Sequence, residues 1–223
     1  MDFRHEWKIN INYSDMITIR QRLSAVMQSD PHCIGGTYFI RSLYFDNIKD
    51  KALLEKLDGV NIREKFRIRY YNNDYSFIVL EKKSKINGLC RKDSVNITKA
   101  EAQSIVDGNI EWMASDGREL VNELYSKMRS QGLKAMTVVD YRRIPFVYAP
   151  GNVRVTIDYD IHTALRTTDF LNPDIATISV PDNPIILEVK WDEFLPGIIR
   201  DAVNLKGRRA EAFSKYAACR MYD

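Results

Sequence analysis

The chain has 223 residues, of which 45% are hydrophobic and 28% are charged. This composition is ordinary for a globular protein and excludes a collagen, a coiled coil and a largely disordered chain. The 33 Lys and Arg residues outnumber the 30 Asp and Glu residues so slightly that the net charge is only +3. Any recognition of anions must therefore depend on how the basic residues are arranged in the fold.

Cysteine content indicates a reducing compartment, and hydropathy gives no sign of a membrane span. The cysteines Cys33, Cys90 and Cys219 are far apart and odd in number, which excludes a disulfide framework and a paired-cysteine metal site. No apolar run reaches the roughly 18 residues of a membrane span, and the N-terminal sequence is too charged for a signal peptide. We therefore expect a cytoplasmic protein with no membrane span, folded as one domain over residues 1–223.

Segments rich in Ile, Val, Tyr, Phe and Thr predict eight strands, and turn residues bound several of them. Asn72-Asn73-Asp74 and Asn87-Gly88 occur where hairpin loops should lie, so residues 62–97 are expected to form an antiparallel meander. A weaker ninth strand is expected near Thr163–Thr168. The eight strands are Phe3–Ile11, Thr37–Phe45, Ile62–Tyr71, Tyr75–Lys83, Leu89–Ile97, Ala135–Arg143, Val153–Tyr159 and Ile185–Lys190.

Four helices are expected among these strands. Ser14 can cap the first helix, and Thr98 with Glu101 forms a capping box at the start of the second. The third helix covers Arg118–Gln131 and the fourth covers Arg208–Arg220. Many strands with a few segregated helices predict a fold of the α+β class.

The strand Ile62–Tyr71 carries a row of like charges. Alternate side chains of a strand share a face, so Arg63, Lys65, Arg67 and Arg69 stand in one row. Neighbours in this row are about 7 Å apart and repel each other by roughly 0.6 kcal/mol in water, and more where water is scarce. An exposed strand tolerates that cost, so this row alone is compatible with a solvated face.

Four further strands also have one apolar face and one row of ionic side chains. In a sandwich these rows would face water. If helices cover the apolar faces from outside, the rows point inward instead, and about eight antiparallel strands can close into a barrel. We therefore predict an α+β fold with a closed, eight-stranded antiparallel β-barrel, helices packed outside and a basic tunnel inside. The four rows are Arg4, Glu6 and Lys8; Glu81, Lys83 and Lys85; Arg154, Thr156, Asp158 and Asp160; and Glu188 and Lys190.

A tunnel of this kind suits a polyanion. Arginine forks bind phosphate oxygens in pairs, and lysine adds point charge. Mg²⁺ and Mn²⁺ prefer oxygen ligands and bridge phosphates, so the sparse carboxylates of the inward rows would hold one of these ions. Those carboxylates are Glu6, Glu81, Asp158 and Glu188.

Eight short motifs follow one another along nearly the whole chain: RHEWK near the start, SLYFD at 42–46, FRIRYY at 66–71, LEKK at 80–83, DYRRIPF at 140–146, VRVTID at 153–158, ILEVK at 186–190 and FSKY at 213–216. In this order they resemble the polyphosphate-polymerase domain of the vacuolar transporter chaperone complex, the VTC domain. That domain belongs to the triphosphate tunnel metalloenzymes. Each motif is weak alone, but eight in sequence make a specific signal.

The resemblance implies a tunnel enzyme, an ATP-polyphosphate phosphotransferase, that adds the γ-phosphate of ATP to a growing polyphosphate chain and releases ADP. ATP and polyphosphate would be its ligands, Mn²⁺ or Mg²⁺ its cofactor and a membrane protein a potential partner, whereas no nucleic acid is expected. The implied catalytic residues are Lys8, Arg67, Arg69, Lys83, Arg143 and Arg154. The implied metal ligand is Glu188, and the implied phosphate-binding residues are Lys92, Ser214 and Lys215, the last two on a C-terminal helix that plugs or borders the tunnel. The inward rows add Arg63, Lys85 and Lys190 as phosphate-binding residues and Glu6 as a second metal ligand.

Two positions depart from the family pattern. Arg4 stands where tunnel triphosphatases carry the first of two glutamates, which favours the polymerase branch over a hydrolase. Leu53 or Leu54 stands where the polymerase carries an arginine, and Arg63 and Arg41 are the candidates to replace that phosphate contact.

Two alternative functions remain open. The first is a tripolyphosphatase or nucleoside triphosphatase in the same tunnel. The second is a noncatalytic module that binds polyphosphate or RNA, although a pI near 8.6 is modest for an RNA-binding protein. The sequence has no P-loop motif, which excludes that class of nucleotide-binding fold.

Overall fold

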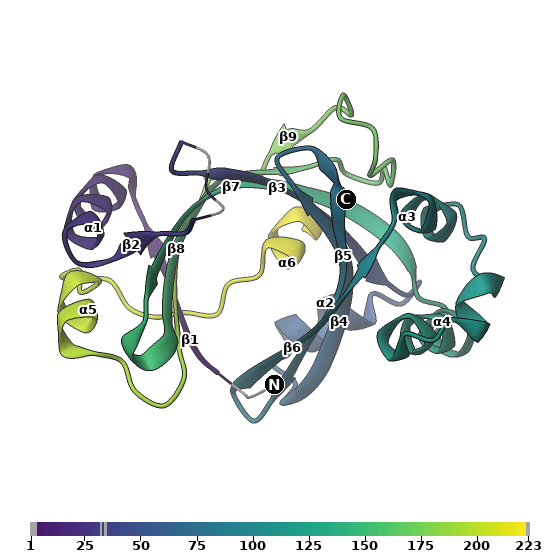
Figure 1. The fold of residues 1–223 in the computed structure, drawn as a ribbon, viewed down its shortest axis with the longest axis horizontal. Coiled ribbons are helices and arrows are strands. Elements are labelled where there is room, and N and C mark those ends of the chain that lie inside the picture. Colours follow the sequence, from purple (N-terminus) through teal and green to yellow (C-terminus); the bar gives the residue numbers. More distant parts are fainter. Residues whose placement is uncertain (1–3, 32, 34, 222–223) are drawn as a thin grey trace.

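A strongly curved antiparallel sheet dominates this computed structural model, which describes residues 4–31, 33 and 35–221 (Figure 1). Within these residues the sheet has ten strands in the order β1-β10-β8-β7-β3-β4-β5-β6, with β2 paired to β7 and β9 paired to β8. The strands are β1 (His5–Ile11), β2 (Gln28–Ser29), β3 (Tyr38–Asp46), β4 (Ile62–Tyr71), β5 (Asp74–Ile86), β6 (Leu89–Ile97), β7 (Lys134–Tyr148), β8 (Val153–Thr163), β9 (Ile178–Ser179) and β10 (Ile185–Trp191).

The eight predicted strands correspond to β1, β3 to β8 and β10, apart from their ends. Phe3, the first residue of the first predicted strand, lies outside the described residues. The prediction of a ninth strand at Thr163–Thr168 is wrong, because β8 ends at Thr163 and the chain turns directly after it. The strands β2 and β9 have only two residues each and are too short to show a sequence alternation.

The two predicted hairpin loops are confirmed. Asn72 and Asn73 between β4 and β5 have φ values of 51° and 56°, and Asn87 and Gly88 between β5 and β6 have φ values of 48° and 87°. A two-residue loop of type I′ needs positive φ at both positions, which Asn and Gly accept most readily. The local turn chemistry therefore sets the register of the β4–β5–β6 meander.

Six α-helices and two short 3₁₀ segments accompany the sheet in the described part of the chain. Three predicted helices are confirmed, because they match α1, α3 and α4, but the predicted cap Ser14 is wrong, since Asn12 caps α1 and Ser14 lies within the helix. The fourth predicted helix, Arg208–Arg220, is helical only over its last residues, and α2 and α5 were not predicted. The bounds are α1 (Tyr13–Val26), α2 (Lys51–Leu57), α3 (Lys99–Val106), α4 (Glu119–Gln131), α5 (Gly197–Ala202) and α6 (Lys215–Arg220), with 3₁₀ segments at Glu111–Ser115 and Pro150–Asn152. None of the helices in the described part has the length and apolar character that a membrane span requires.

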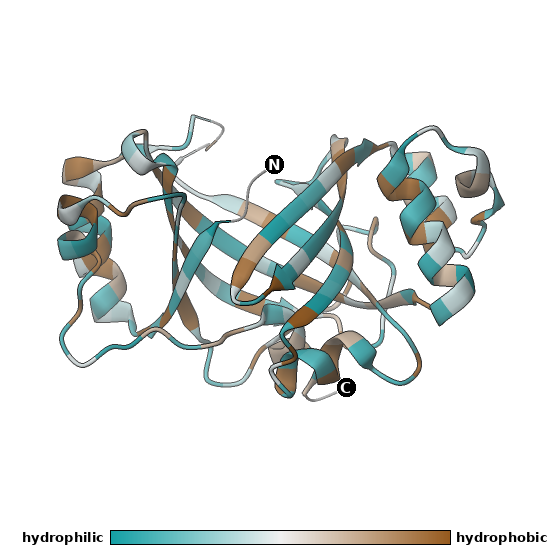
Figure 2. Ribbon diagram, turned by 90° about the horizontal axis from the view of Figure 1, so that it is seen from below, coloured by the Kyte–Doolittle hydropathy of each residue, from teal (hydrophilic) through white to brown (hydrophobic). Residues whose placement is uncertain are grey.

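Helices cover the convex, outer face of the sheet on two sides (Figure 2). On one side, Phe66 and Ile68 of β4 are buried in a cluster with Leu124 of α4. On the other side, Val189 of β10 is buried in a cluster with Leu23 of α1. Burying one large apolar side chain stabilises a fold by about 1.5–3 kcal/mol, so these contacts fix the apolar faces outward. The charged rows consequently face the concave side, as the alternation predicted.

The prediction of a closed, eight-stranded barrel is wrong, because the sheet stays open between its edge strands β1 and β6. Among the described residues these edges meet at one bridge, between Arg4 and Cys90, with N–O distances of 3.1 and 3.4 Å. Further along β1, the backbone N of Glu211 donates to the Lys8 carbonyl at 2.8 Å, and Ala210 bridges Ile9. Because residues 210 and 211 pair with the edge of β1, this stretch is extended rather than helical and β6 cannot pair there.

Helix α6 lies inside the curve of the sheet (Figure 1). Ser214 caps it by accepting a hydrogen bond from the Ala217 backbone N at 3.3 Å. The Tyr216 ring stacks on Tyr44 of β3 at 5.1 Å between centroids, and its hydroxyl donates to Asp46 at 2.8 Å. Apolar contacts of this helix therefore fill one part of the interior and leave the rest to charged side chains.

Arg41 of β3, a candidate phosphate contact, is absent from the lining of the charged cavity and pairs with Asp140 instead. Its Nε and Nη2 donate to the two carboxylate oxygens of Asp140 at 2.9 and 2.8 Å, and both side chains are buried. Alternation in β3 puts Arg41 on the face opposite to Ser42, outside the charged cavity. Arg41 and Asp140 thus form a structural ion pair.

Replacing Arg41 with methionine is expected to lower the free energy of unfolding by about 3–5 kcal/mol, because Asp140 would stay buried without its charged partner. Denaturation with guanidinium chloride measures this loss. Arg91→Met is the control, since the Arg91–Asp93 pair is partly exposed, at 48% and 27% of the two side chains, and should contribute at most about 1 kcal/mol. Equal losses in the two variants would contradict the structural role of Arg41.

Candidate functional site

The concave face of the sheet borders a cavity of about 510 Å³. Among the described residues, twelve lysines and arginines and four carboxylates line this charged cavity, which leaves a formal excess of eight positive charges when every side chain is counted in its usual ionised form. Most of them belong to the rows that the strand alternation predicted. The basic residues are Arg4, Lys8, Lys65, Arg67, Arg69, Lys83, Arg91, Lys92, Arg143, Arg154, Lys190 and Lys215, and the carboxylates are Glu6, Glu81, Glu188 and Asp192.

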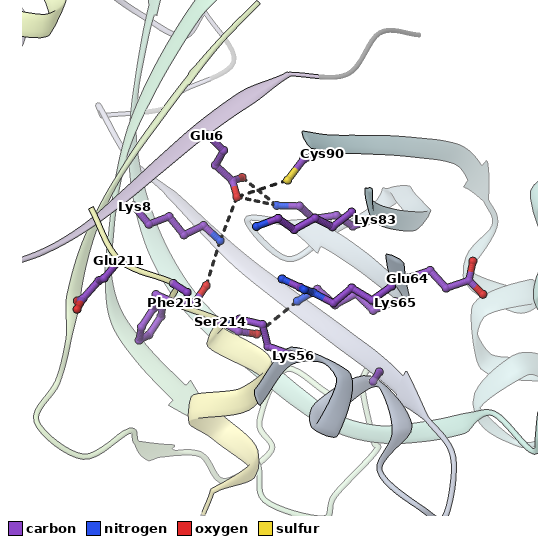
Figure 3. Close-up of a pocket in the computed structure, with 14 residues that line it drawn as sticks. Glu6, Lys8, Lys56, Glu64, Lys65, Lys83, Cys90, Glu211, Phe213 and Ser214 are labelled. Carbon is purple, nitrogen blue, oxygen red and sulfur yellow. Dashed lines mark hydrogen bonds and ion pairs between the residues drawn. The ribbon is translucent and has the colours of Figure 1, made fainter. Parts of the chain in front are cut away.

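The structure brings twelve of the fourteen predicted site residues to the charged cavity: Lys8, Arg67, Arg69, Lys83, Arg143, Arg154, Lys92, Lys190, Ser214, Lys215, Glu6 and Glu188. Arg63 and Lys85 line a smaller neighbouring cavity of about 120 Å³ instead (Figure 3). Lys8, Lys65 and Lys83 line both cavities, so the two cavities are adjacent and share part of their walls. The chemical roles of all fourteen residues stay predictions.

On one wall of the charged cavity, Arg67 and Arg69 of β4 flank Glu81 of β5. Arg67 Nε donates to Glu81 at 2.7 Å and its Nη1 donates to the Tyr44 hydroxyl at 2.9 Å. Arg69 Nη2 donates to the Tyr141 hydroxyl at 3.0 Å. Burial alone would raise the pKa of Glu81, but the two arginines outweigh it and hold the pKa far below its usual range. Glu81 is therefore ionised, and it fixes the arginine side chains along the wall.

A second ionic cluster joins β7, β8 and α6. Arg143 Nε and Nη2 donate to the carboxylate oxygens of Asp158 at 2.6 and 2.7 Å, and Lys215 Nζ donates to the same carboxylate at 2.5 Å. Asp158 is fully buried, which would raise its pKa, but Arg143 and Lys215 outweigh burial and hold the pKa at about 2. This cluster ties the interior helix to the sheet.

Two glutamates, Glu6 of β1 and Glu188 of β10, lie side by side between lysines. Lys190 Nζ is 3.5 Å from Glu6 and 3.3 Å from Glu188, and Lys8 Nζ is 3.4 and 3.7 Å from the same two groups. Lys83 Nζ also donates to Glu6 at 2.8 Å. Burial and the neighbouring Glu188 would raise the pKa of Glu6, but these three lysines lower it overall. Both glutamates therefore stay ionised at neutral pH.

The glutamate pair fits a divalent metal that shares its ligands with phosphate. Within residues 4–31, 33 and 35–221, no group of three or more His, Cys, Asp and Glu side chains could hold a metal ion by itself. Mg²⁺ typically takes one or two carboxylates, and phosphate oxygens and waters complete its shell. Glu6 and Glu188 provide such a pair, whereas Glu81 and Asp158 are each held by an arginine within 3 Å.

Several lining residues were not among the predicted site residues, and three of them, Lys65, Tyr44 and Tyr141, contribute to the arrangement of the basic wall. Lys65 lines both cavities, and its place in the charged row of β4 was the available signal. Tyr44 and Tyr141 hold Arg67 and Arg69, but a tyrosine in a strand is usually part of a core and gives no such signal.

The sequence profile of the VTC domain matches residues 3–222. The chain belongs to the VTC domain family. Membership supports a phosphate-related function for the charged cavity. A comparison of this chain with curated proteins found no match.

Solved structures support the fold. The PH1012 protein of Pyrococcus horikoshii OT3 has 14% identity and a TM-score of 0.53, and the match covers 97% of this chain and 99% of that chain. A candidate adenylate cyclase of Bacillus halodurans has 14% identity and a TM-score of 0.48 over 85% of this chain and 80% of that chain. At these identities the likeness to PH1012 shows a shared fold alone, and the weaker match carries no argument.

The acid stability of this VTC domain should depend on Asp158. Its pKa is about 2 in the folded protein and about 3.9 in an unfolded chain, so its ion pairs stabilise the fold above pH 4 and lose that effect as the pH falls towards 2. Between pH 5 and pH 3, Asp158→Asn should lose roughly 1 kcal/mol less unfolding free energy than the wild type. Urea denaturation at each pH measures this difference, and Asp93→Asn, which keeps Asp158, should parallel the wild type.

Proposed function

We propose that this VTC domain is a metal-dependent polyphosphate polymerase that transfers the γ-phosphate of ATP to the end of a polyphosphate chain. One observation carries the proposal: the basic rows of several strands face a single cavity with a formal excess of eight positive charges. Phosphoryl transfer requires little covalent chemistry from a protein, because positioning and stabilisation of negative charge provide most of the rate. A cavity lined in this way is suited to both tasks.

The arginines of the two ionic clusters would hold the reacting phosphates. Arg67 and Arg69 approach from β4 and Arg143 approaches from β7, and all three are oriented by carboxylate or hydroxyl partners. A side chain that is already oriented loses less freedom when it binds a phosphate oxygen. Lys8 and Lys83 would add positive charge from β1 and β5.

The pair Glu6 and Glu188 would hold Mn²⁺ or Mg²⁺ together with phosphate oxygens. Such an ion bridges phosphate groups and neutralises the charge that develops on them during transfer. Lys8 and Lys190 keep the two carboxylates side by side. Phosphate oxygens would then compete with these lysines for the same region of the cavity.

The ionisation of the carboxylates favours polymerisation over hydrolysis. Hydrolysis requires a group that orients and deprotonates water, and a carboxylate whose pKa lies far below neutral is a weak base. The pKa values of Glu6 and Glu81 are both lowered, since lysines and arginines outweigh the effect of burial. A terminal phosphate acceptor is already deprotonated and needs no such base. ATP and polyphosphate are accordingly the proposed ligands, without a nucleic acid, and a membrane protein that receives the chain is the proposed partner.

Incubation of the purified protein with ATP and Mn²⁺ distinguishes the candidate reactions. We expect ADP together with long phosphate chains, which gel electrophoresis resolves by length. Free orthophosphate as the main product would identify a hydrolase and overturn the polymerase proposal. Tight, salt-dependent binding of polyphosphate without any turnover would identify a noncatalytic module.

Replacing Glu188 with glutamine tests the metal site. Losing one of two carboxylate ligands should weaken Mn²⁺ affinity by at least roughly tenfold, so thermal stabilisation by Mn²⁺ should require a correspondingly higher concentration. Glu211→Gln is the matched control, because Glu211 is exposed beside the smaller cavity and its side chain has no ion-pair partner in the described structure. Unchanged Mn²⁺ titration in Glu188→Gln would remove Glu188 from the metal site.

A further inference from the structure

Lys65 differs from the other basic side chains of the charged cavity. Among the described residues, eleven of the twelve lysines and arginines that line the cavity lie within 4 Å of a carboxylate oxygen, and Lys65 does not. Its Nζ lies 3.4 Å from the Ser214 hydroxyl and 5.3 Å from the centre of the Tyr44 ring. The fold therefore gives this lysine a serine hydroxyl and a tyrosine ring as neighbours where it gives the other cations a carboxylate.

The charged groups nearest to Lys65 are themselves cations. Lys83 of β5, Lys8 of β1 and Arg67 of β4 all oppose its protonation, whereas the phenolate form of Tyr44 of β3 favours it. Burial and these cations lower the pKa of Lys65 to about 7. Two carboxylates near the two cavities already have cationic partners. Glu6 pairs with Lys8, Lys83 and Lys190, and Glu64 pairs with Lys82 and Lys127. The remaining basic residues of the smaller cavity add positive charge: Lys56, Arg63 and Lys85.

Lys65 also lies where the two cavities meet. Figure 3 shows it beside Ser214 and pointing into the same space as Lys8 and Lys83, whereas Glu64 points away. In the described part of the smaller cavity, Lys56, Arg63 and Lys85 have no carboxylate within 4 Å either. A phosphate group at this junction would meet several cations. It would not have to displace a carboxylate from Lys65.

We propose that Lys65 binds a phosphate group at the junction of the two cavities and takes up one proton from solvent as that phosphate binds. The amine becomes an ammonium, and the negative charge of the phosphate provides the counter-charge that the protein omits. In the absence of phosphate the neutral amine avoids repulsion from Lys8, Lys83 and Arg67. The inference rests on the proposed function only in taking phosphate chains as ligands of the cavity.

The pH dependence of affinity follows from this linkage. Binding favours the protonated form of Lys65, so its contribution is complete below about pH 7 and weakens as the pH rises above that value. The affinity for phosphate should fall by up to about tenfold for each pH unit until the pKa of the bound state is reached. Lys65→Arg keeps the charge at all these pH values and should lose this part of the pH dependence.

Calorimetry with inorganic tripolyphosphate, without metal, tests the proposal. Titrations at pH 8 in two buffers of different ionisation enthalpy give the number of protons taken up per ligand bound. The wild type should take up close to one proton more than Lys65→Arg, because protons on tripolyphosphate itself contribute equally to both. Lys127→Met should keep the wild-type proton uptake, since Lys127 lies outside the lining of both cavities and pairs with Glu64. Thermal unfolding of each variant verifies that it is folded.

Two results would overturn the proposal. The first is equal proton uptake in the wild type and in Lys65→Arg. The second is a Tyr44→Phe variant that loses the proton uptake while Lys65→Arg retains it. The pKa of Tyr44 is also lowered to about 7, so Tyr44 would then be the group that takes up the proton. If tripolyphosphate binds to none of these proteins, the phosphate function of the cavity fails as well, which distinguishes that failure from a wrong role for Lys65.

Discussion

The balance between buried positive and negative charge is the constraint on which the rest of this structure depends. Placing a row such as Arg67 and Arg69 on a concave face brings like charges together where water is scarce, and an unpaired buried charge is costly. Glu81 and Asp158 offset part of that cost, since each is held by guanidinium or ammonium groups within 3 Å. The carboxylates remain fewer than the cations, so the cavity keeps a positive excess that phosphate can neutralise.

The outer cores determine which way this charge faces. In β4, Phe66, Ile68 and Tyr70 pack under helices on the convex side, so strand alternation leaves the basic residues no position except the concave side. Helix α6 occupies part of the remaining interior and links back to the sheet through the Lys215–Asp158 and Tyr216–Asp46 contacts. Apolar burial outside and ion pairing inside therefore support the same geometry.

Local patterns explain what could be predicted from the sequence. The meander from β4 to β6 rests on a two-residue alternation and two Asn-containing turns, both of which are readable from neighbouring residues. Whether the sheet closes could not be predicted in this way, because it depends on the edge of β1. There the backbone N of Glu211 donates to the carbonyl of Lys8, more than 200 positions away in the sequence. The row of β4 likewise identified Lys65 as inward, but its lack of a carboxylate partner is a property of all the surrounding strands together.

The same ion pairs connect the stability of the site with the reaction it favours. An arginine that holds Glu81 in place also lowers its pKa, and a carboxylate with a low pKa is a poor base for activating water. Structural fixation of the walls and the weak basicity of Glu81 thus arise from one set of contacts. Lys65 is the exception that this arrangement allows. Because no carboxylate of the described residues lies within 4 Å of it, its charge would respond to the ligand, whereas the pairing of Arg67 with Glu81 and of Arg143 with Asp158 keeps both guanidinium groups charged.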